Sequence, residues 1–154
     1  MTRDFTIVVI EPIHKSGIEI LQKHAKVIQL PVGSTEKDLL KVSEQADAFV
    51  TRGFVKIPRE VLEKAKRLKV VGAHGVGVDH IDVDSAQKRR IQIIRTPEAL
   101  TDTVAEFTVG LMLSLLRKIP KADAAIRSGN WRQKYSDLVG VDLKGKTVGI
   151  IGLG

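Results

Sequence analysis

A run of closely spaced glycines is the part of this sequence best suited to binding an anion. Gly72-Ala73-His74-Gly75-Val76-Gly77-Val78-Asp79 follows an apolar segment that is typical of a β-strand. Consecutive backbone N–H groups in such a turn can point toward one anion, so the run predicts a carboxylate site. Ligands of open α/β sheets gather at the carboxyl ends of strands, which favours the same place. A glycine-rich turn without a ligand is the alternative, and Asp79 suits a turn-stabilising role better than that of a base.

Two further side chains belong to the same predicted sheet edge. Thr51-Arg52-Gly53 ends another apolar segment, and the Arg52 guanidinium could pair with the acid group of a substrate. A solvent-exposed arginine without a ligand explains the residue equally well. His74 could be a base only with a partner carboxylate, and none can be assigned to it. No metal site is expected, because metal-ligand spacing is absent from His14, His24 and His80.

A second glycine pair, Gly152-Leu153-Gly154, follows Thr147–Ile151, which we predict to be a strand. The dinucleotide fingerprint G-x-G-x-x-G begins in this way, with a tight turn at the first glycine and close approach of the pyrophosphate at the second. The third glycine, the anion-binding helix and the acidic ribose ligand would come next. The sequence therefore predicts the beginning of a nucleotide site, with a simple turn after a strand as the alternative.

The residues that position these motifs alternate between strand and helix patterns. Short apolar runs predict strands at 5–10, 27–30, 48–50, 68–73 and 91–94, and helices are expected at 17–24, 35–45, 59–67 and 85–88. This alternation predicts an α/β, flavodoxin-like parallel-sheet unit over residues 1–97. Periodicity does not give the order of its strands. Asp82 or Asp84 is expected to cap the helix that follows.

The remaining sequence has a different pattern. Thr101–Lys118 is apolar around its circumference, which predicts a helix buried in a large core or at a subunit contact. Glu106 within it is either placed by function or, as we favour, a structural carboxylate bonded to neighbouring backbone. A second helix is expected at 121–128. Residues 130–144 are loop-like, with Trp131 and Tyr135 as packing anchors.

Composition excludes several classes of protein. The 25 Lys+Arg and 18 Asp+Glu give a formal charge of +7, spread along the chain except for Lys88-Arg89-Arg90, which we place at a helix end. No nucleic-acid partner is expected, because no recognition module accompanies the charge. Cysteine is absent, so disulfides and thiolate metal sites are excluded. No signal-peptide pattern is found, and the uncharged stretch Phe107–Leu116 is too short to span a bilayer, so we expect a cytoplasmic protein without a membrane partner.

Taken together, the motifs resemble one family. Leu68–Asp82, Thr96-Pro97, Val104-Ala105-Glu106, Gly129-Asn130-Trp131 and Leu143–Gly154 occur in the order and spacing of D-isomer-specific 2-hydroxyacid dehydrogenases, most similar to the phosphoglycerate dehydrogenase branch. The resemblance implies an oxidoreductase that transfers hydride between a D-2-hydroxy acid and the nicotinamide of NAD or NADP. It also implies that 1–97 are the first segment of the substrate domain and 98–154 the start of a truncated Rossmann NAD-binding domain.

The resemblance assigns roles to individual residues. Arg52, Gly53, Gly75, Val76 and Gly77 would bind the substrate acid, and Val76, Thr103, Gly152 and Gly154 would lie at the cofactor. The family's substrate-orienting arginine and its histidine–carboxylate pair would lie beyond residue 154. The isolated chain is therefore expected to be inactive and to bind NAD weakly. A homodimer through residues 100–135 is also implied.

Some residues depart from the family pattern. Arg95, Glu98 and Leu100 replace two asparagines and a glycine, and His80 stands where asparagine is common. These changes leave the substrate acid open. Two other functions compete: a non-enzymatic module that binds a small acid or a partner, and a basic nucleic-acid binder, which would show salt-sensitive binding.

Overall fold

The computed structural model describes residues 5–152. The chain divides into two compact units, Met1–Ala99 and Leu100–Gly154.

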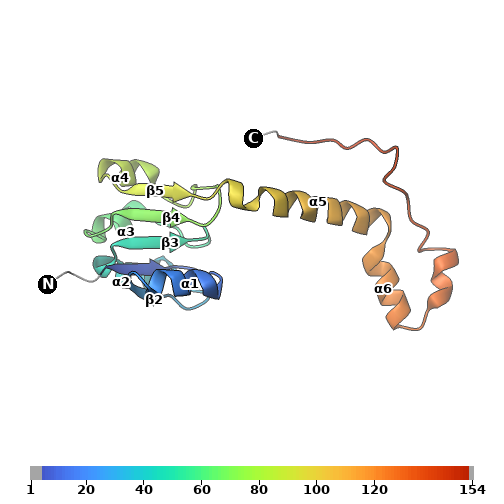
Figure 1. The fold of residues 1–154 in the computed structure, drawn as a ribbon, viewed down its shortest axis with the longest axis horizontal. Coiled ribbons are helices and arrows are strands. Elements are labelled where there is room, and N and C mark those ends of the chain that lie inside the picture. The colour runs from blue at the N-terminus through green and yellow to red at the C-terminus, as the bar shows by residue number, and fades with distance from the viewer. Residues whose placement is uncertain (1–4, 153–154) are drawn as a thin grey trace. The chain divides into compact units, whose positions relative to one another are not determined.

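A five-stranded parallel sheet organises the first unit (Figure 1). Its strands are β1 (Thr6–Val9), β2 (Lys26–Gln29), β3 (Ala48–Thr51), β4 (Val70–Ala73) and β5 (Gln92–Arg95). They lie in the order β2-β1-β3-β4-β5, with every neighbouring pair parallel. This is the strand order of flavodoxin, and it confirms the predicted α/β, flavodoxin-like class. Every predicted strand of this unit is present, within a few residues of its predicted bounds.

Four helices connect the strands: α1 (Lys15–Gln22), α2 (Glu36–Val42), α3 (Arg59–Lys64) and α4 (Val83–Lys88). Local sequence sets their first turns. The Asp38 carboxylate in the first turn of α2 accepts the Thr35 N–H at 3.1 Å, which satisfies a backbone donor that the helix leaves open. The Asp82 carboxylate caps α4 by accepting the Ser85 N–H at 2.9 Å. Of the two expected caps, Asp82 is therefore the one used. The Lys88-Arg89-Arg90 run begins at the last residue of this helix and so lies at a helix end, as predicted.

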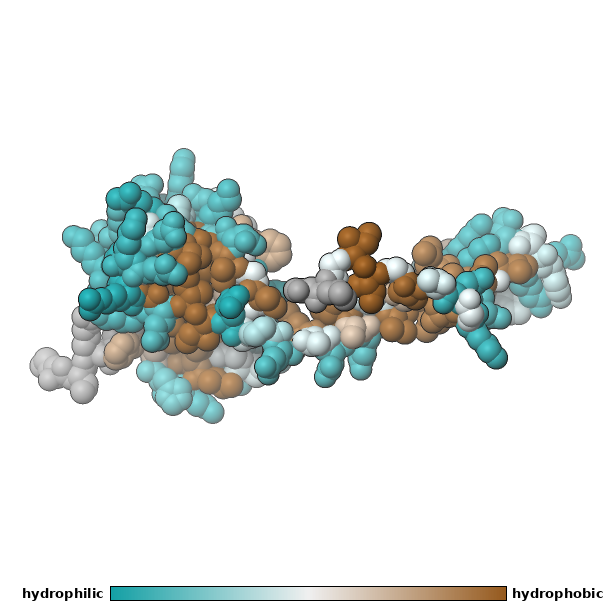
Figure 2. All heavy atoms as spheres, turned by 90° about the horizontal axis from the view of Figure 1, so that it is seen from above, coloured by the Kyte–Doolittle hydropathy of each residue, from teal (hydrophilic) through white to brown (hydrophobic). Residues whose placement is uncertain are grey.

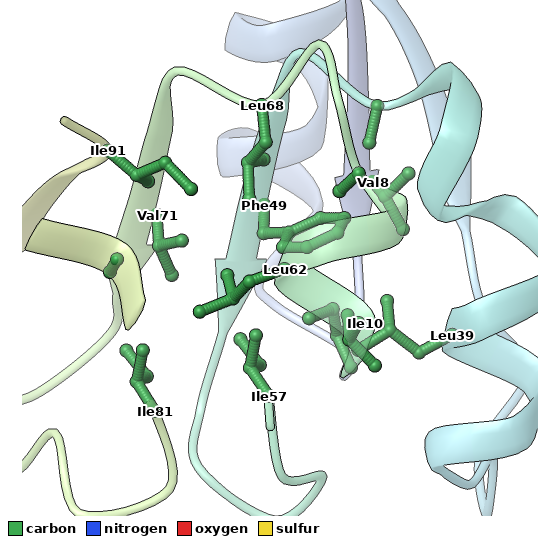
Figure 3. Close-up of a cluster of buried hydrophobic side chains, with 14 of the residues drawn as sticks. Val8, Ile10, Leu39, Phe49, Ile57, Leu62, Leu68, Val71, Ile81 and Ile91 are labelled. Atoms are coloured by element: carbon green, nitrogen blue, oxygen red, sulfur yellow. The ribbon is translucent and has the colours of Figure 1, made fainter. Parts of the chain in front are cut away.

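The hydrophobic core lies against one face of the sheet (Figure 3). Its largest members come from strands, helices and the loops between them: Val8, Ile10, Leu39, Phe49, Ile57, Leu62, Leu68, Val71, Ile81 and Ile91. Val9 lies outside this cluster but is also buried, and so is Ile18 of α1. Successive strand residues point to opposite faces, so both faces of the sheet are covered. Each fully buried large side chain stabilises the fold by roughly 1.5–3 kcal/mol.

The second unit contains α5 (Thr101–Leu116), preceded by the 3-10 turn Glu98–Leu100, then α6 (Ile119–Arg127) and a 3-10 helix at Trp131–Tyr135. No residue of α5 is buried within the described chain, and Figure 2 shows hydrophobic side chains at the surface of this unit. Its large exposed hydrophobic residues include Val104, Phe107, Val109, Leu111, Leu113 and Leu115. The described chain thus leaves uncovered the helix that the sequence predicted to be buried.

The same helix bears on the membrane question. Among the described residues, Glu98–Leu116 is a 19-residue helical segment long and apolar enough to cross a membrane by length and composition. The uncharged stretch Phe107–Leu116 within this segment is too short to span a bilayer, but the whole helical segment is long enough. A core helix of a soluble protein passes the same test. The acidic Asp102 and Glu106 lie within the segment, and such side chains are expensive inside a bilayer.

The strand and the aromatic packing predicted for the second unit are both wrong. Residues 147–151 do not form a strand in the described chain, and Ile150 is 73% exposed. A strand needs a neighbour to accept its backbone hydrogen bonds, and no sheet is described in this unit. Trp131 and Tyr135 are exposed rather than packing anchors. Their rings instead lie 4.6 and 4.8 Å from the Lys134 ammonium, a cation–π arrangement at the surface.

Candidate functional site

A pocket lies where two loops leave the same edge of the first unit's sheet. β3 and β4 are parallel with Thr51 paired to Ala73, so the segments 52–56 and 74–80 begin side by side. Together they line a pocket of about 470 Å³. The site residues predicted in this unit, Arg52, Gly53, Gly75, Val76 and Gly77, all line it. The two motifs, more than twenty residues apart in the sequence, thus meet in one cavity.

Backbone hydrogen bonds fix the two loops against each other. The Thr51 carbonyl accepts the His74 N–H at 2.7 Å, and the His80 carbonyl accepts the Ile57 N–H at 2.7 Å. Within the first loop, the Gly53 N–H donates to Thr51 Oγ1 at 3.1 Å. The pocket therefore has a preformed backbone frame on both sides.

The glycine turn has two backbone donors available. The Gly75 N–H donates to Thr96 Oγ1 at 3.0 Å, and the Thr96 N–H donates to the Gly75 carbonyl at 2.9 Å, which anchors the turn to the segment after β5. Gly75 has φ of +143°, a conformation that suits glycine. The N–H groups of Val76 and Gly77 have no acceptor among the described residues, and both residues are exposed. These two donors can bind an anion without breaking a bond of the fold.

Charged side chains around the turn favour an anion. Arg52 and Lys56 line the pocket with Asp79, and all three are exposed. One Arg52 nitrogen, Nη1, donates to the Pro12 carbonyl at 3.1 Å, which leaves the rest of the guanidinium fork for a carboxylate or phosphate. His74 also lines the pocket and is exposed. In the described part of the chain, no histidine ring is hydrogen-bonded to a carboxylate, so none forms an acid–base pair.

His80 is more enclosed than the other charged or titratable groups of the pocket. Burial lowers the pKa of its imidazole below the usual 6.5, and the charges of Glu11 and Asp79 oppose this shift only partly. Its Nε2 is buried and has no hydrogen-bond partner among the described residues. Its ring also lies close to Gly53: a side-chain carbon added there would be 3.3 Å from His80 Nδ1. The imidazole thus packs behind Gly53 in the Arg52 loop.

Glu11 is the residue of this region that sequence reasoning missed. It is 7% exposed, and its carboxylate accepts three backbone N–H groups from the loop after β3. The sequence analysis assigned no role to Glu11. The available signal was its position just after a predicted strand; that the loop after β3 lies beside it depends on the pairing of β1 with β3, which only the structure gives.

The other predicted residues lie in the second unit or outside the described residues. Thr103 is in the first turn of α5, and Gly154 falls outside the described chain. Gly152 has φ of +85°, as the first glycine of a tight turn would. Without a strand before it or a helix described after it, the described residues do not form a pyrophosphate cradle. Glu106 is exposed and makes no described hydrogen bond, contrary to the backbone bond expected of it.

Among the described residues, no group of three or more His, Asp or Glu side chains could hold a metal ion.

Comparison with known proteins links this site to a family. Residues 7–148 match the family model described as D-isomer specific 2-hydroxyacid dehydrogenase, catalytic domain. The chain is 43% identical over 148 residues to a D-3-phosphoglycerate dehydrogenase of Methanocaldococcus jannaschii, an alignment that covers 96% of this chain and 28% of the relative. The chain thus spans little more than a quarter of that relative's length.

Solved structures agree. A protein of Thermus thermophilus shares 30% identity at a TM-score of 0.82, with 92% of this chain and 46% of that chain covered. An NADPH-dependent glyoxylate/hydroxypyruvate reductase of Sinorhizobium meliloti, solved with NADP and malonate, shares 28% identity at a TM-score of 0.75, covering 99% of this chain and 47% of its own. Both similarities extend over nearly all of the present sequence.

Proposed function

Since the chain belongs to the D-isomer-specific 2-hydroxyacid dehydrogenase family, we propose that its first unit binds the carboxylate of a small 2-hydroxy or 2-oxo acid. The observation that carries this proposal is the pair of Val76 and Gly77 N–H groups, which have no acceptor among the described residues and line a pocket with Arg52 and Lys56. A carboxylate that accepts both N–H groups would be held by charge-assisted hydrogen bonds.

The basic side chains of the pocket could bind a second anionic group, at the end of the acid away from its carboxylate. Arg52 and Lys56 outnumber Asp79 in the pocket lining, so a second anionic group on the substrate would be favoured. 3-Phosphoglycerate fits this pattern, and relatives of this chain include D-3-phosphoglycerate dehydrogenases. Gly53 lets the loop pass close to the His80 ring.

The family consists of oxidoreductases whose members bind NAD or NADP. We assign residues 1–97 to the first segment of a substrate domain and 98–154 to the start of an NAD-binding domain in a cytoplasmic enzyme. That enzyme would transfer hydride between a nicotinamide and C2 of the acid. Because the described residues lack a pyrophosphate cradle and a hydrogen-bonded histidine–carboxylate pair, the 154-residue chain would bind the acid without turning it over.

Association of two copies through residues 100–135 completes the proposal. The exposed apolar surface of α5 supports it, since monomers rarely leave such a large patch in water. A two-fold contact would cover the same residues on both copies.

Acid binding can be tested by titrating the isotopically labelled chain with 3-phosphoglycerate, D-glycerate or malonate and following amide NMR signals. We expect shifts concentrated at Arg52, Gly53, Gly75, Val76 and Gly77. Arg52→Ala should weaken binding at least fivefold. Arg59→Ala is the matched control, because Arg59 is exposed on α3 and paired with Glu63 at 2.6 Å, outside the pocket lining. The absence of shifts in the glycine turn with every acid would exclude the site.

A further inference from the structure

We infer that Glu11 is a positioning residue of the acid site: its buried carboxylate holds the Arg52 loop in the conformation that binds the acid. The inference rests on the proposed function, because it assigns a role within the same site. Glu11 lines no part of that pocket and would not touch the acid. It acts through the backbone of the residues that do.

The contacts of Glu11 cover most of one turn of the loop. Oε2 accepts the Arg52 N–H at 2.8 Å, and Oε1 accepts the N–H groups of Phe54 at 3.0 Å and Val55 at 2.8 Å. The Gly53 N–H between them bonds back to Thr51 Oγ1. Each backbone donor from Arg52 to Val55 is therefore satisfied, three of the four by one side chain.

The residues on either side of Glu11 are held in place by their own contacts. The preceding residue, Ile10, is 1% exposed in the core, and its N–H donates to the Val50 carbonyl of β3 at 2.9 Å. The carbonyl of the following residue, Pro12, accepts a hydrogen bond from Arg52 Nη1 at 3.1 Å. The end of β1 thus holds both the backbone and the side chain of Arg52.

The chemistry of the contact requires a carboxylate. An ionised carboxylate only accepts hydrogen bonds, so it suits three converging donors, whereas a glutamine would turn its NH₂ group toward at least one of them. A buried charge is stable only with such hydrogen bonds. Close to an anion site, a negative charge by itself opposes binding. The Glu11 carboxylate is therefore explained by the conformation of the Arg52 loop that it maintains.

A charge role and a positioning role predict opposite changes in acid affinity for Glu11→Gln. If Glu11 acted only through its charge, Glu11→Gln would strengthen acid binding. If it acted only on global stability, the folded variant would bind as the wild type does. A positioning role predicts at least tenfold weaker binding of 3-phosphoglycerate or malonate by the folded variant, measured by NMR or calorimetric titration.

Glu44→Gln is the matched control, because Glu44 is exposed and its carboxylate oxygen Oε1 lies 3.8 Å from Lys64 Nζ, a long ion pair. It removes the same charge and should change affinity less than twofold. Glu11→Asp keeps the charge on a shorter side chain and should bind between wild type and Glu11→Gln. Thermal unfolding of each variant establishes that the titrated protein is folded. Wild-type or tighter binding by folded Glu11→Gln would overturn the inference.

Amide hydrogen exchange of the wild-type chain tests the same contact without a variant. The Arg52, Phe54 and Val55 amides should exchange at least a hundredfold more slowly, after correction for intrinsic rates, than those of Val76 and Gly77. If the two groups of amides exchanged at equal rates in a chain that binds acid, the inference about Glu11 would be overturned and the proposed function would stand. A wild-type chain that binds no acid would overturn the proposed function and, with it, the role of Glu11 in acid binding.

Discussion

Replacing Gly53 with alanine should destabilise the first unit and disturb the acid site together. Gly53 has φ of +97°, outside the range that residues with a side chain readily adopt. The new methyl group would also lie 3.3 Å from Nδ1 and 3.5 Å from Cε1 of His80. The imidazole must therefore move by a few tenths of an ångström, although its Nε2 is already buried.

The two effects can be estimated separately. The left-handed backbone costs roughly 1–2 kcal/mol for a residue with a side chain, and the lower entropy of the unfolded chain offsets about 0.4–1 kcal/mol of this. Forcing His80 off its preferred rotamer adds about 0.5–1.5 kcal/mol. We therefore expect Gly53→Ala to lower the free energy of unfolding by roughly 1–2.5 kcal/mol, within the usual range for point substitutions.

Gly33→Ala is the control for the backbone effect. Gly33 has φ of +85°, and an added side-chain carbon there meets nothing within 4 Å. Its substitution should cost only the net strain, about 0.5–1 kcal/mol. The difference between the two variants measures the contact with His80.

Native-state hydrogen exchange of the buried strand residues Phe49 and Val71 reports the stability of the first unit, which contains no tryptophan. Stability should be measured for Gly53→Ala alone and combined with His80→Ala, which removes the ring. The double-mutant cycle should give a coupling of about 0.5–1.5 kcal/mol. The steric argument would be refuted if Gly53→Ala cost no more than Gly33→Ala, or if its full cost persisted without the imidazole.

Three further predictions concern activity, pH and association. The purified 154-residue chain should show no NAD-dependent oxidation of 3-phosphoglycerate or D-glycerate and no micromolar NADH binding by fluorescence titration; reproducible turnover would contradict the proposed division of the site. Burial lowers the pKa of His80 below its unfolded value of 6.5, so the folded state binds fewer protons than the unfolded state; the contribution of His80 to stability is therefore full above about pH 6.5 and is lost as pH falls through the folded pKa. His80→Asn should flatten this loss in urea titrations from pH 7 to 5. An unchanged pH profile would be evidence against this role of His80. Light scattering of the wild-type chain at micromolar concentration should give a dimer mass. Leu111 and Leu115 are 54% and 79% exposed, and the double variant Leu111→Lys, Leu115→Lys should give a monomer mass. A monomeric wild type would reject the α5 contact.

The sequence by itself determined the α/β class and the strands of the first unit. Short apolar runs that end at glycine or proline specify buried strands locally, and the Asp82 cap depends on a residue three positions away. The spacing of the motifs also identified the family. The strands and the cap could be predicted because their causes lie within a few consecutive residues.

Only the tertiary structure decided which segments meet. The order β2-β1-β3-β4-β5 places the end of β1 beside that of β3, and this brings Glu11 to amides more than forty residues away. The enclosure of His80 depends on the same packing. Residues 147–151 show the converse: their apolar pattern is that of a strand, yet they form none in the described chain. A strand exists only with a neighbour that takes its hydrogen bonds, and no pattern within one segment supplies that neighbour.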